Sequence, residues 1–204
     1  EPELQLAEEQ KQRVLWQMME QGLNCPTTTS CGRFFDGIAA LLGVCLTADY
    51  EGQAAMELES LAQQAMGELD LADLLENCSW ETTTVFSENR LIWQQNILVQ
   101  EVLNQLSNGS DPAAIALDFH LCLIQSLCHL LCKLAEETKI TKVVLTGGCM
   151  QNTLLLEGLF ILLEQNDFTV YTGMQIPVND GGIALGQAII GGLRHVSGST
   201  HESN

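Results

Sequence analysis

The sequence predicts a helix-rich α/β fold with a short parallel βαβ unit near its C-terminus. Two observations support this class. Through residues 1–138, apolar side chains mostly recur three or four positions apart, the spacing of amphipathic helices. Beyond Lys139 the pattern changes to two short apolar runs, residues 142–145 and 168–171, separated by a glycine turn and a helical stretch. Strands joined by a helix in this way are expected to be parallel, with a right-handed connection.

Length and composition bound the domain organisation. The chain has 204 residues, of which 46% are hydrophobic and 17% charged. This suits one globular domain with a sizeable core, or two small ones at most. We expect a single domain over residues 1–196 and a polar, flexible tail over residues 197–204.

The charge balance argues against nucleic acid and membrane surfaces as partners. Asp and Glu total 26 against 8 Lys and Arg, which gives a formal charge of -18. Such a field repels phosphate backbones and anionic lipids. No uninterrupted apolar run of about 18 residues occurs, and the first residues do not resemble a signal peptide. The expected location is the cytoplasm.

Three helices are expected in the first third of the chain, over residues 1–21, 31–42 and 52–66. Gly22 and Gly43 end the first two, and a run of threonine and serine offers N-caps for the second. The side chains expected to face inward are Leu4, Ala7, Val14, Leu15, Met18 and Met19 in the first helix, and Ala55, Met56, Leu58, Leu61, Ala62 and Ala65 in the third.

The middle of the chain predicts a helical pair. Residues 67–84 show little regularity, with one weak strand pattern at 83–86. Long helical patterns follow over residues 88–106 and 112–138. The loop between them ends at Asp111, an expected N-cap followed by proline at the first helical position. A short loop between two long helices predicts that they pack antiparallel.

The C-terminal part contains the predicted βαβ unit. Its elements are a strand at 142–145, a helix at 152–165 and a strand at 168–171. A loop over residues 172–180 then leads to a final helix over about residues 181–193.

A glycine pair, Gly147 and Gly148, joins the first of these strands to its helix. Glycines here let a ligand approach the backbone, and the helix N-terminus offers free amides and a positive dipole end to a phosphate. The alternative is that the pair only permits close packing of strand and helix. The pattern alone does not decide between them.

Three carboxylates are candidates for ligand contacts. Asp180 follows the second strand, where it either caps the final helix or faces the same crevice as the glycine pair and holds a metal that neutralises phosphate. Asp36 and Glu57 are either solvated helix residues or acceptors for the hydroxyls of a ribose, since an ionised carboxylate can bridge a diol.

The eight cysteines are expected to be reduced thiols, because a chain of this length does not need disulfides. Cys128 and Cys132, with Cys122 and His129 nearby, raise the possibility of a metal site. No CxxC pair occurs, and core packing is the preferred interpretation. Packing is also preferred for Cys149 beside the glycine pair, so no nucleophile or general base is assigned.

The motifs in their order resemble the HypF family of hydrogenase-maturation carbamoyltransferases, over essentially the whole chain. HypF in turn resembles TsaD, of tRNA threonylcarbamoyladenosine synthesis, and antibiotic O-carbamoyltransferases, all in the actin-like (ribonuclease H-like) ATPase superfamily. The chain would be the C-terminal lobe of that module. The matching segments are GRFFDGIAALLG (32–43), YEGQAAMELE (50–59), Phe119-His120, LTGGCMQN (145–152) and PVNDGGIALGQ (177–187).

The resemblance implies a two-step reaction. Carbamoyl phosphate and ATP give a carbamoyl adenylate, and the carbamoyl group then passes to the C-terminal cysteine of HypE for the cyanide ligands of nickel-iron hydrogenase. By matching motifs, the nucleotide contacts would be Asp36 and Glu57 at the ribose, Gly52 beside the nucleoside, and Gly147, Gly148 and Asn152 around the adenosine and phosphates.

The resemblance also assigns Asp180 as one ligand of a divalent metal (Mg, or Fe or Zn), completed by histidines outside this chain. The family's paired HxxxH histidines do not occur here, and His120 is expected to pack or hydrogen-bond internally. HypF-type enzymes further contain acylphosphatase-like, zinc-finger and YrdC-like domains and a first actin-like lobe, none of which this sequence resembles.

Two kinds of explanation follow. The chain is part of a carbamoyltransferase, incomplete and inactive alone, whose partners are the remaining HypF domains or a complementary subunit and a HypE-type acceptor. Alternatively, it is a non-catalytic nucleotide- or protein-binding remnant, or serves an O-carbamoyltransferase for a small hydroxylated molecule. Co-occurrence of Asp36, Glu57, Asn152 and Asp180 favours the first. The charge disfavours a tRNA-modifying role.

Overall fold

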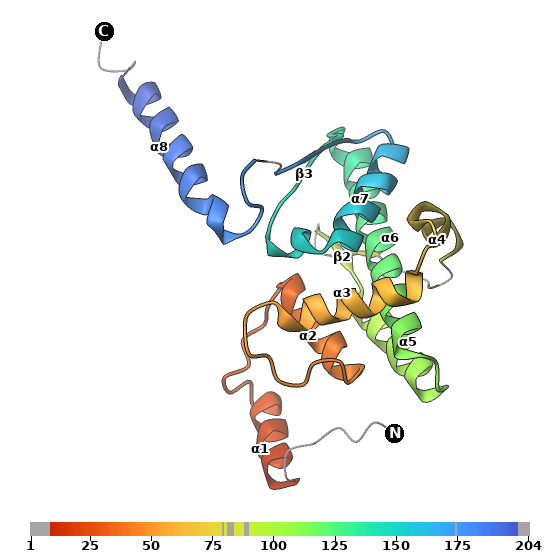
Figure 1. Ribbon diagram of the computed structural model, residues 1–204. Helices are drawn as coiled ribbons and strands as arrows, with labels where there is room; N and C mark the ends of the chain where they lie inside the picture. The colour runs from red at the N-terminus through yellow and green to blue at the C-terminus, as the bar shows by residue number, and fades with distance from the viewer. Residues whose placement is uncertain (1–8, 79, 81–83, 88–89, 174, 200–204) are drawn as a thin grey trace. The chain divides into compact units, whose positions relative to one another are not determined.

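The computed structural model describes residues 9–78, 80, 84–87, 90–173 and 175–199. The chain divides into two compact units, Glu1–Leu58 and Glu59–Asn204. The division falls inside helix α3, Gln53–Met66. The order of the elements along the chain can be followed in Figure 1.

The first unit contains α1 (Glu9–Glu20), α2 (Cys31–Leu41) and the beginning of α3. The predicted second and third helices are confirmed. The Ser30 hydroxyl caps α2 by accepting a hydrogen bond from the Arg33 amide, 3.4 Å away. The helix ends before Gly43, whose φ of +70° suits glycine.

Two expectations about inward-facing side chains are wrong. In α1, Val14, Leu15 and Met19 are each more than half exposed, and Leu4 and Ala7 lie outside the described residues. The amphipathic pattern of this helix therefore predicts an apolar stripe, but it does not predict that other residues of the chain bury that stripe.

In α3 the predicted apolar stripe is confirmed only in part. Met56 is half exposed, whereas Ala54, Leu58 and Ala62 are buried. These three residues follow each other at intervals of four, which places them on one helix face. Leu58 and Ala62 were predicted correctly.

After α3, the second unit contains a short helix and a pair of strands, of which the sequence pattern predicted only the first strand. A short helix, α4 (Leu71–Asn77), is capped by the Asp70 side chain, which accepts from the Ala72 amide at 2.8 Å. Strands β1 (Thr84–Ser87) and β2 (Arg90–Trp93) pair antiparallel, Thr84 opposite Trp93. The weak strand pattern is confirmed at residues 84–86, and its first residue lies outside the described ones.

The predicted helix over residues 88–106 begins later than expected. Residues 90–93 form β2, and the helix itself, α5, spans Gln95–Ser107. Leu-Ile-Trp at 91–93 combines apolar, β-branched and aromatic side chains, which fit a strand when a partner strand is present. Pairing with β1 therefore overrides the helical periodicity at this point.

The central helix of the second unit is α6, Pro112–Thr138, as predicted, with Asp111 as its N-cap. It packs against α5 and α7 (Thr153–Gln165); Figure 1 shows α6 and α7 side by side. A Cβ at Gly158 of α7 would lie 2.6 Å from Ile124 Cδ1 of α6, so glycine permits this close approach. By length and composition α6 could cross a membrane, but 61% of its most apolar stretch is buried, as in a core helix.

The βαβ unit follows the prediction closely. Strand β3 (Lys142–Leu145) pairs parallel with β4 (Thr169–Thr172), Lys142 opposite Thr169, and α7 connects them. Strand β4 begins one residue later than expected. The short 3-10 helix η1 (Gly148–Gln151) separates the glycine turn from α7.

The chain continues through the 3-10 helix η2 (Asp180–Gly182) into α8 (Ile183–Ser199). The helix runs past the expected end near Leu193 and includes the first residues of the segment predicted as a tail. Residues 200–204 lie outside the described part. The large apolar side chains of α8 are 45 to 64% exposed: Ile183, Leu185, Ile189, Ile190 and Leu193.

Candidate functional site

The glycine turn after β3 has a backbone conformation that requires glycine. Gly147 has φ +103° and ψ 161°, a combination of backbone dihedral angles that is essentially restricted to glycine. Its amide donates a hydrogen bond to the Val178 carbonyl at 2.7 Å, and its carbonyl accepts from the Met150 amide at 3.0 Å. The turn is thereby tied to the loop that follows β4.

The loop after β4 is itself folded tightly. Asn179 accepts from the Gly181 amide at 3.0 Å and so caps η2. A Cβ at Gly182 would clash with the Pro177 carbonyl oxygen, which explains glycine at this position. Because Asn179 makes the cap, Asp180 is left with its side chain exposed.

These two loops and the first turns of α8 line a pocket of about 580 Å³. Gly147, Asn179 and Asp180 are all part of its lining. The structure therefore brings together two segments that the sequence analysis singled out independently. The aliphatic part of the lining comes from Val144, Leu145, Ile176, Pro177, Val178, Ile183, Leu185 and Ile189.

Asn152 occupies the junction between the turn and α7 and is 7% exposed. Its Oδ1 accepts from the Leu155 amide at 2.8 Å, and its Nδ2 lies 3.0 Å from His120 Nε2. The Nδ1 atom of His120 lies 2.7 Å from the Ala116 carbonyl oxygen, which can only accept. We therefore assign the proton to Nδ1, so that Nε2 accepts from Asn152.

The N-terminus of α7 is also held from α3. Glu59 Oε1 accepts from the Thr153 amide at 2.6 Å and from the Thr153 hydroxyl at 2.5 Å. Gln63 Nε2 donates to the same hydroxyl at 2.9 Å. The expectation of free amides at this helix start is wrong for Thr153 and Leu155, because Glu59 and Asn152 already accept from them.

Glu59 was not predicted as a site residue, and the sequence shows only how it is placed relative to Glu57. Glu57 and Glu59 stand two positions apart on α3, which places them on nearly opposite faces of the helix. The two carboxylates therefore point toward different parts of the protein. The prediction about His120 is confirmed, because it is fully buried and hydrogen-bonded within the protein.

In the first unit, the two predicted ribose carboxylates lie near one buried thiol. Asp36 forms an ion pair with Arg33, 3.1 Å apart, and Glu57 accepts from Gln53 Nε2 at 2.7 Å. Burial, and then the charges of Glu57 and Asp36, raise the pKa of the Cys45 thiol. Asp49 raises this pKa as well, so the thiol stays protonated near neutral pH.

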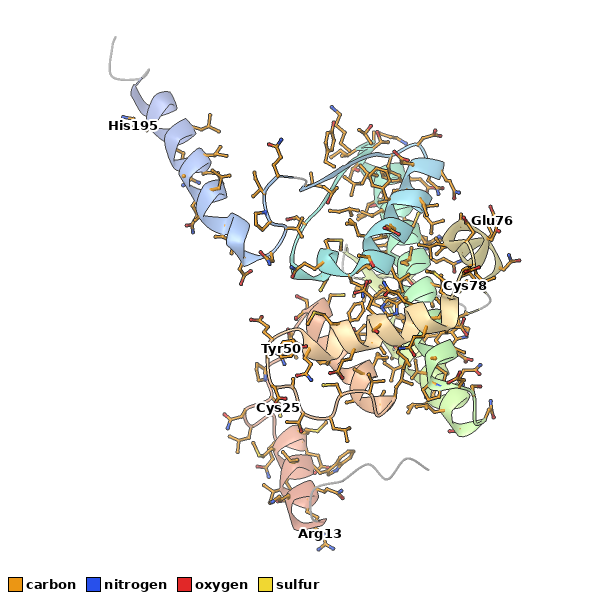
Figure 2. The ribbon with its side chains drawn as sticks, viewed as in Figure 1. Arg13, Cys25, Tyr50, Glu76, Cys78 and His195 are labelled. Atoms are coloured by element: carbon orange, nitrogen blue, oxygen red, sulfur yellow. The ribbon has the colours of Figure 1, made fainter. Side chains whose placement is uncertain are left out.

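The segment that carries Glu57 is ordered by its neighbours. Gly52, with φ +82°, immediately precedes α3. The Gln53 side chain accepts from the Asp49 amide at 2.7 Å and thereby closes the preceding turn. Tyr50, labelled in Figure 2, lies in that turn with its side chain exposed.

The predicted site residues thus fall into two sets. Asp36, Gly52 and Glu57 belong to the first unit, and Gly147, Gly148, Asn152 and Asp180 belong to the second. Among the described residues, no group of three or more His, Cys, Asp or Glu is arranged to hold a metal. Asp180 can offer a hard oxygen ligand to a divalent cation, but the other ligands would have to come from elsewhere.

The eight cysteines are free thiols. Cys122 and Cys128 are buried on α6, and burial raises the pKa of each thiol to about 12. They remain protonated near neutral pH and pack as small apolar groups.

We predict that the folded chain loses stability as the pH falls below about 6.5, because burial lowers the pKa of His120 from its ordinary value of 6.5. The Ala116 carbonyl and the Glu59 carboxylate oppose this shift. The unfolded chain then binds a proton that the folded chain excludes, so stability is present above pH 6.5 and is lost below it. The contribution is at most about 1.4 kcal/mol per pH unit.

The measurement is the urea midpoint between pH 7.5 and 5 for the wild type and for His120→Gln, which cannot titrate. Groups such as Asp118, whose pKa burial raises, affect both proteins equally. Parallel pH profiles for the two would contradict the prediction.

Comparison with known proteins shows the family to which this chain is related. Residues 1–187 match the family described as "Carbamoyltransferase, Kae1-like Domain, second subdomain". Curated relatives include carbamoyltransferase HypF of Rhodobacter capsulatus, 34% identical, where the match covers 85% of this chain and 21% of the relative. The probable carbamoyltransferase HypF of Methanocaldococcus jannaschii is 28% identical over 89% of the chain and 22% of its own length.

Solved structures give the same result. Full-length HypF in a phosphate- and nucleotide-bound form superposes with a TM-score of 0.80 and 34% identity, over 91% of this chain and 23% of that one. HypF of T. kodakarensis gives a TM-score of 0.76 and 30% identity, over 92% of this chain and 23% of that one. The predicted helix-rich lobe of an actin-like module is confirmed.

The chain spans about a fifth to a quarter of the length of these relatives. Its family is nevertheless defined by a match that covers most of its sequence. The chain belongs to the HypF carbamoyltransferase family and corresponds to the second subdomain of the Kae1-like domain.

Proposed function

We propose that this chain supplies one part of the ATP site of a HypF-type carbamoyltransferase. The complete enzyme would form carbamoyl adenylate from carbamoyl phosphate and ATP and transfer the carbamoyl group to the C-terminal cysteine of a HypE-type acceptor in the cytoplasm. The observation that carries the proposal is the pocket at the ends of β3 and β4, where Gly147 and Asp180 face one cavity. One of the matching HypF structures is described as phosphate- and nucleotide-bound.

The pocket suits the phosphates and the cation of a nucleotide. The glycine turn exposes backbone without side chains in the way, and Asp180 offers a carboxylate without a hydrogen-bonding partner among the described residues. A divalent cation held by Asp180, phosphate oxygens and ligands from outside this chain would neutralise the charge of the phosphates. Asp36 and Glu57 would accept hydrogen bonds from the ribose hydroxyls.

The exposed apolar side chains of α8 support the view that this chain acts as part of a larger protein. Five aliphatic residues on one helix are about half exposed or more, which is costly for a surface that stays in water. The remaining domains of a HypF-type protein, or a complementary subunit, are the proposed occupants. A non-catalytic remnant has no physical need for a carboxylate in the lining of the pocket, such as Asp180, or for a turn that only glycine can adopt at position 147.

The proposal predicts that the paired variant Asp36→Ala, Glu57→Ala weakens ATP binding by roughly tenfold or more, because the ribose hydroxyls lose two charged acceptors. The measurement is calorimetric titration of the chain with ATP and Mg²⁺. The matched control is Glu76→Ala, Glu164→Ala, which removes the same charge at exposed sites; Glu76 is labelled in Figure 2.

Equal affinities for the two variants would contradict the ribose assignment. An absence of heat from the wild type, with its helical content verified by circular dichroism, would count against autonomous nucleotide binding and favour the remnant interpretation.

A further inference from the structure

We infer that His120 is a positioning residue that holds the glycine turn of the proposed nucleotide site through Asn152. This inference rests on the proposed function for its consequence, but its structural content can be tested without nucleotide. His120 is fully buried in α6 and lies at hydrogen-bond distance from a side chain next to the site. The relevant contacts all lie within the second unit.

The geometry leaves Asn152 one suitable arrangement. Its oxygen accepts from the Leu155 amide, so its amide nitrogen must find an acceptor inside the protein. His120 Nε2, 3.0 Å away, is the acceptor that the structure provides. The Ala116 carbonyl holds the other ring nitrogen in the donating form, so the core helix fixes both the ring and its tautomer.

Asn152 in turn fixes the backbone of the turn. Its amide donates to the Cys149 carbonyl at 3.2 Å, and its carbonyl accepts from the Leu156 amide at 3.0 Å. The residue therefore belongs to both η1 and α7. A displacement of Asn152 moves η1, whose first residue is Gly148.

The neighbouring residue is held independently. Glu59 accepts from both the amide and the hydroxyl of Thr153. Two side chains from α3 and α6 thus hold the two consecutive residues at which α7 begins. This arrangement assigns Asn152 a structural bond in addition to its predicted place near the nucleotide. It also explains the presence of a polar residue in the most buried stretch of α6.

The experiment compares three variants of the chain. His120→Phe fills the space but removes the acceptor, whereas His120→Gln retains an acceptor near the position of Nε2. Ser126→Ala is the control, because Ser126 is also buried in α6 but donates to the Cys122 carbonyl of its own helix. Amide hydrogen exchange is measured at Gly147 and Asn152, and ATP affinity is measured by calorimetry with Mg²⁺.

For His120→Phe we expect exchange at these two amides to accelerate about tenfold beyond the change in global stability, since a buried donor loses its partner. ATP affinity should fall by a similar factor. His120→Gln should recover most of both effects, and Ser126→Ala should show neither. If His120→Phe and Ser126→Ala behave alike after correction for stability, the inference is overturned.

The two readouts separate this inference from the proposed function. Faster exchange in His120→Phe, together with no ATP binding by the wild type, would support the positioning role and count against the proposed function. ATP binding by the wild type, together with unchanged exchange in His120→Phe, would support the proposed function and count against the positioning role.

Discussion

Gly147→Ala is expected to abolish measurable ATP binding while destabilising the chain by about 1–3 kcal/mol. The backbone of Gly147, with φ +103° and ψ 161°, is inaccessible to alanine without strain. To relieve that strain the turn must change its dihedrals, and its amide then loses the 2.7 Å hydrogen bond to the Val178 carbonyl. The two loops around the pocket would then separate, so the pocket would lose its shape even in the absence of ligand.

Steric clash does not explain this effect, because a Cβ at Gly147 would meet no atom within 4 Å. Gly148→Ala is therefore the control for the loss of stability; Gly148 is itself a proposed nucleotide contact, so its ATP affinity does not serve as a control. Its Cβ would also meet nothing within 4 Å, and its φ lies outside the left-handed range. Calorimetry with ATP and Mg²⁺ and urea unfolding are run on both variants. Similar losses of stability in the two would show that backbone strain is not what glycine at position 147 relieves.

The elements that the sequence predicted well are those with strong local signals. Helices α2, α6 and α7 carry capping residues together with apolar stripes, α3 carries an apolar stripe, and the glycine pair separates β3 from α7. Strand β2 was missed because residues 90–93 form a strand by pairing with β1. The local hydrophobic pattern does not predict that pairing. Helix α4, a short helix with a clear Asp70 cap, was missed for its brevity.

The candidate site shows the same division between local and long-range information. The glycine turn and Asp180 could be found from sequence because each follows a strand and precedes a helix. The bonds of Glu59 to Thr153 and of His120 to Asn152 join residues 94 and 32 positions apart, respectively. Helical spacing indicates only that Glu59 faces away from Glu57. What a side chain meets on that face depends on packing, which one sequence does not reveal.

Phe119→Ala is expected to reduce the free energy of unfolding by about 3–5 kcal/mol, because it opens a large cavity in the core of the second unit. Phe119 is fully buried in α6, where burial is concentrated. Since small domains have a total stability of about 5–15 kcal/mol, this single change should leave a measurable unfolded fraction at 37 °C. Urea unfolding followed by circular dichroism measures the loss.

Leu134→Ala provides the matched control on the same helix, since Leu134 is partly exposed and its truncation should cost little. A comparable loss in the two variants would mean that α6 is not the centre of the core. Phe119 also contacts the His120 ring edge-on, with ring centroids 5.4 Å apart and planes at 81°. Phe119→Leu, which keeps most of the apolar volume, should cost less than about 1.5 kcal/mol yet remove this contact. Comparing its hydrogen exchange at Asn152 with that of Leu134→Ala then tests whether the aromatic ring helps to hold His120, and hence the glycine turn, in place.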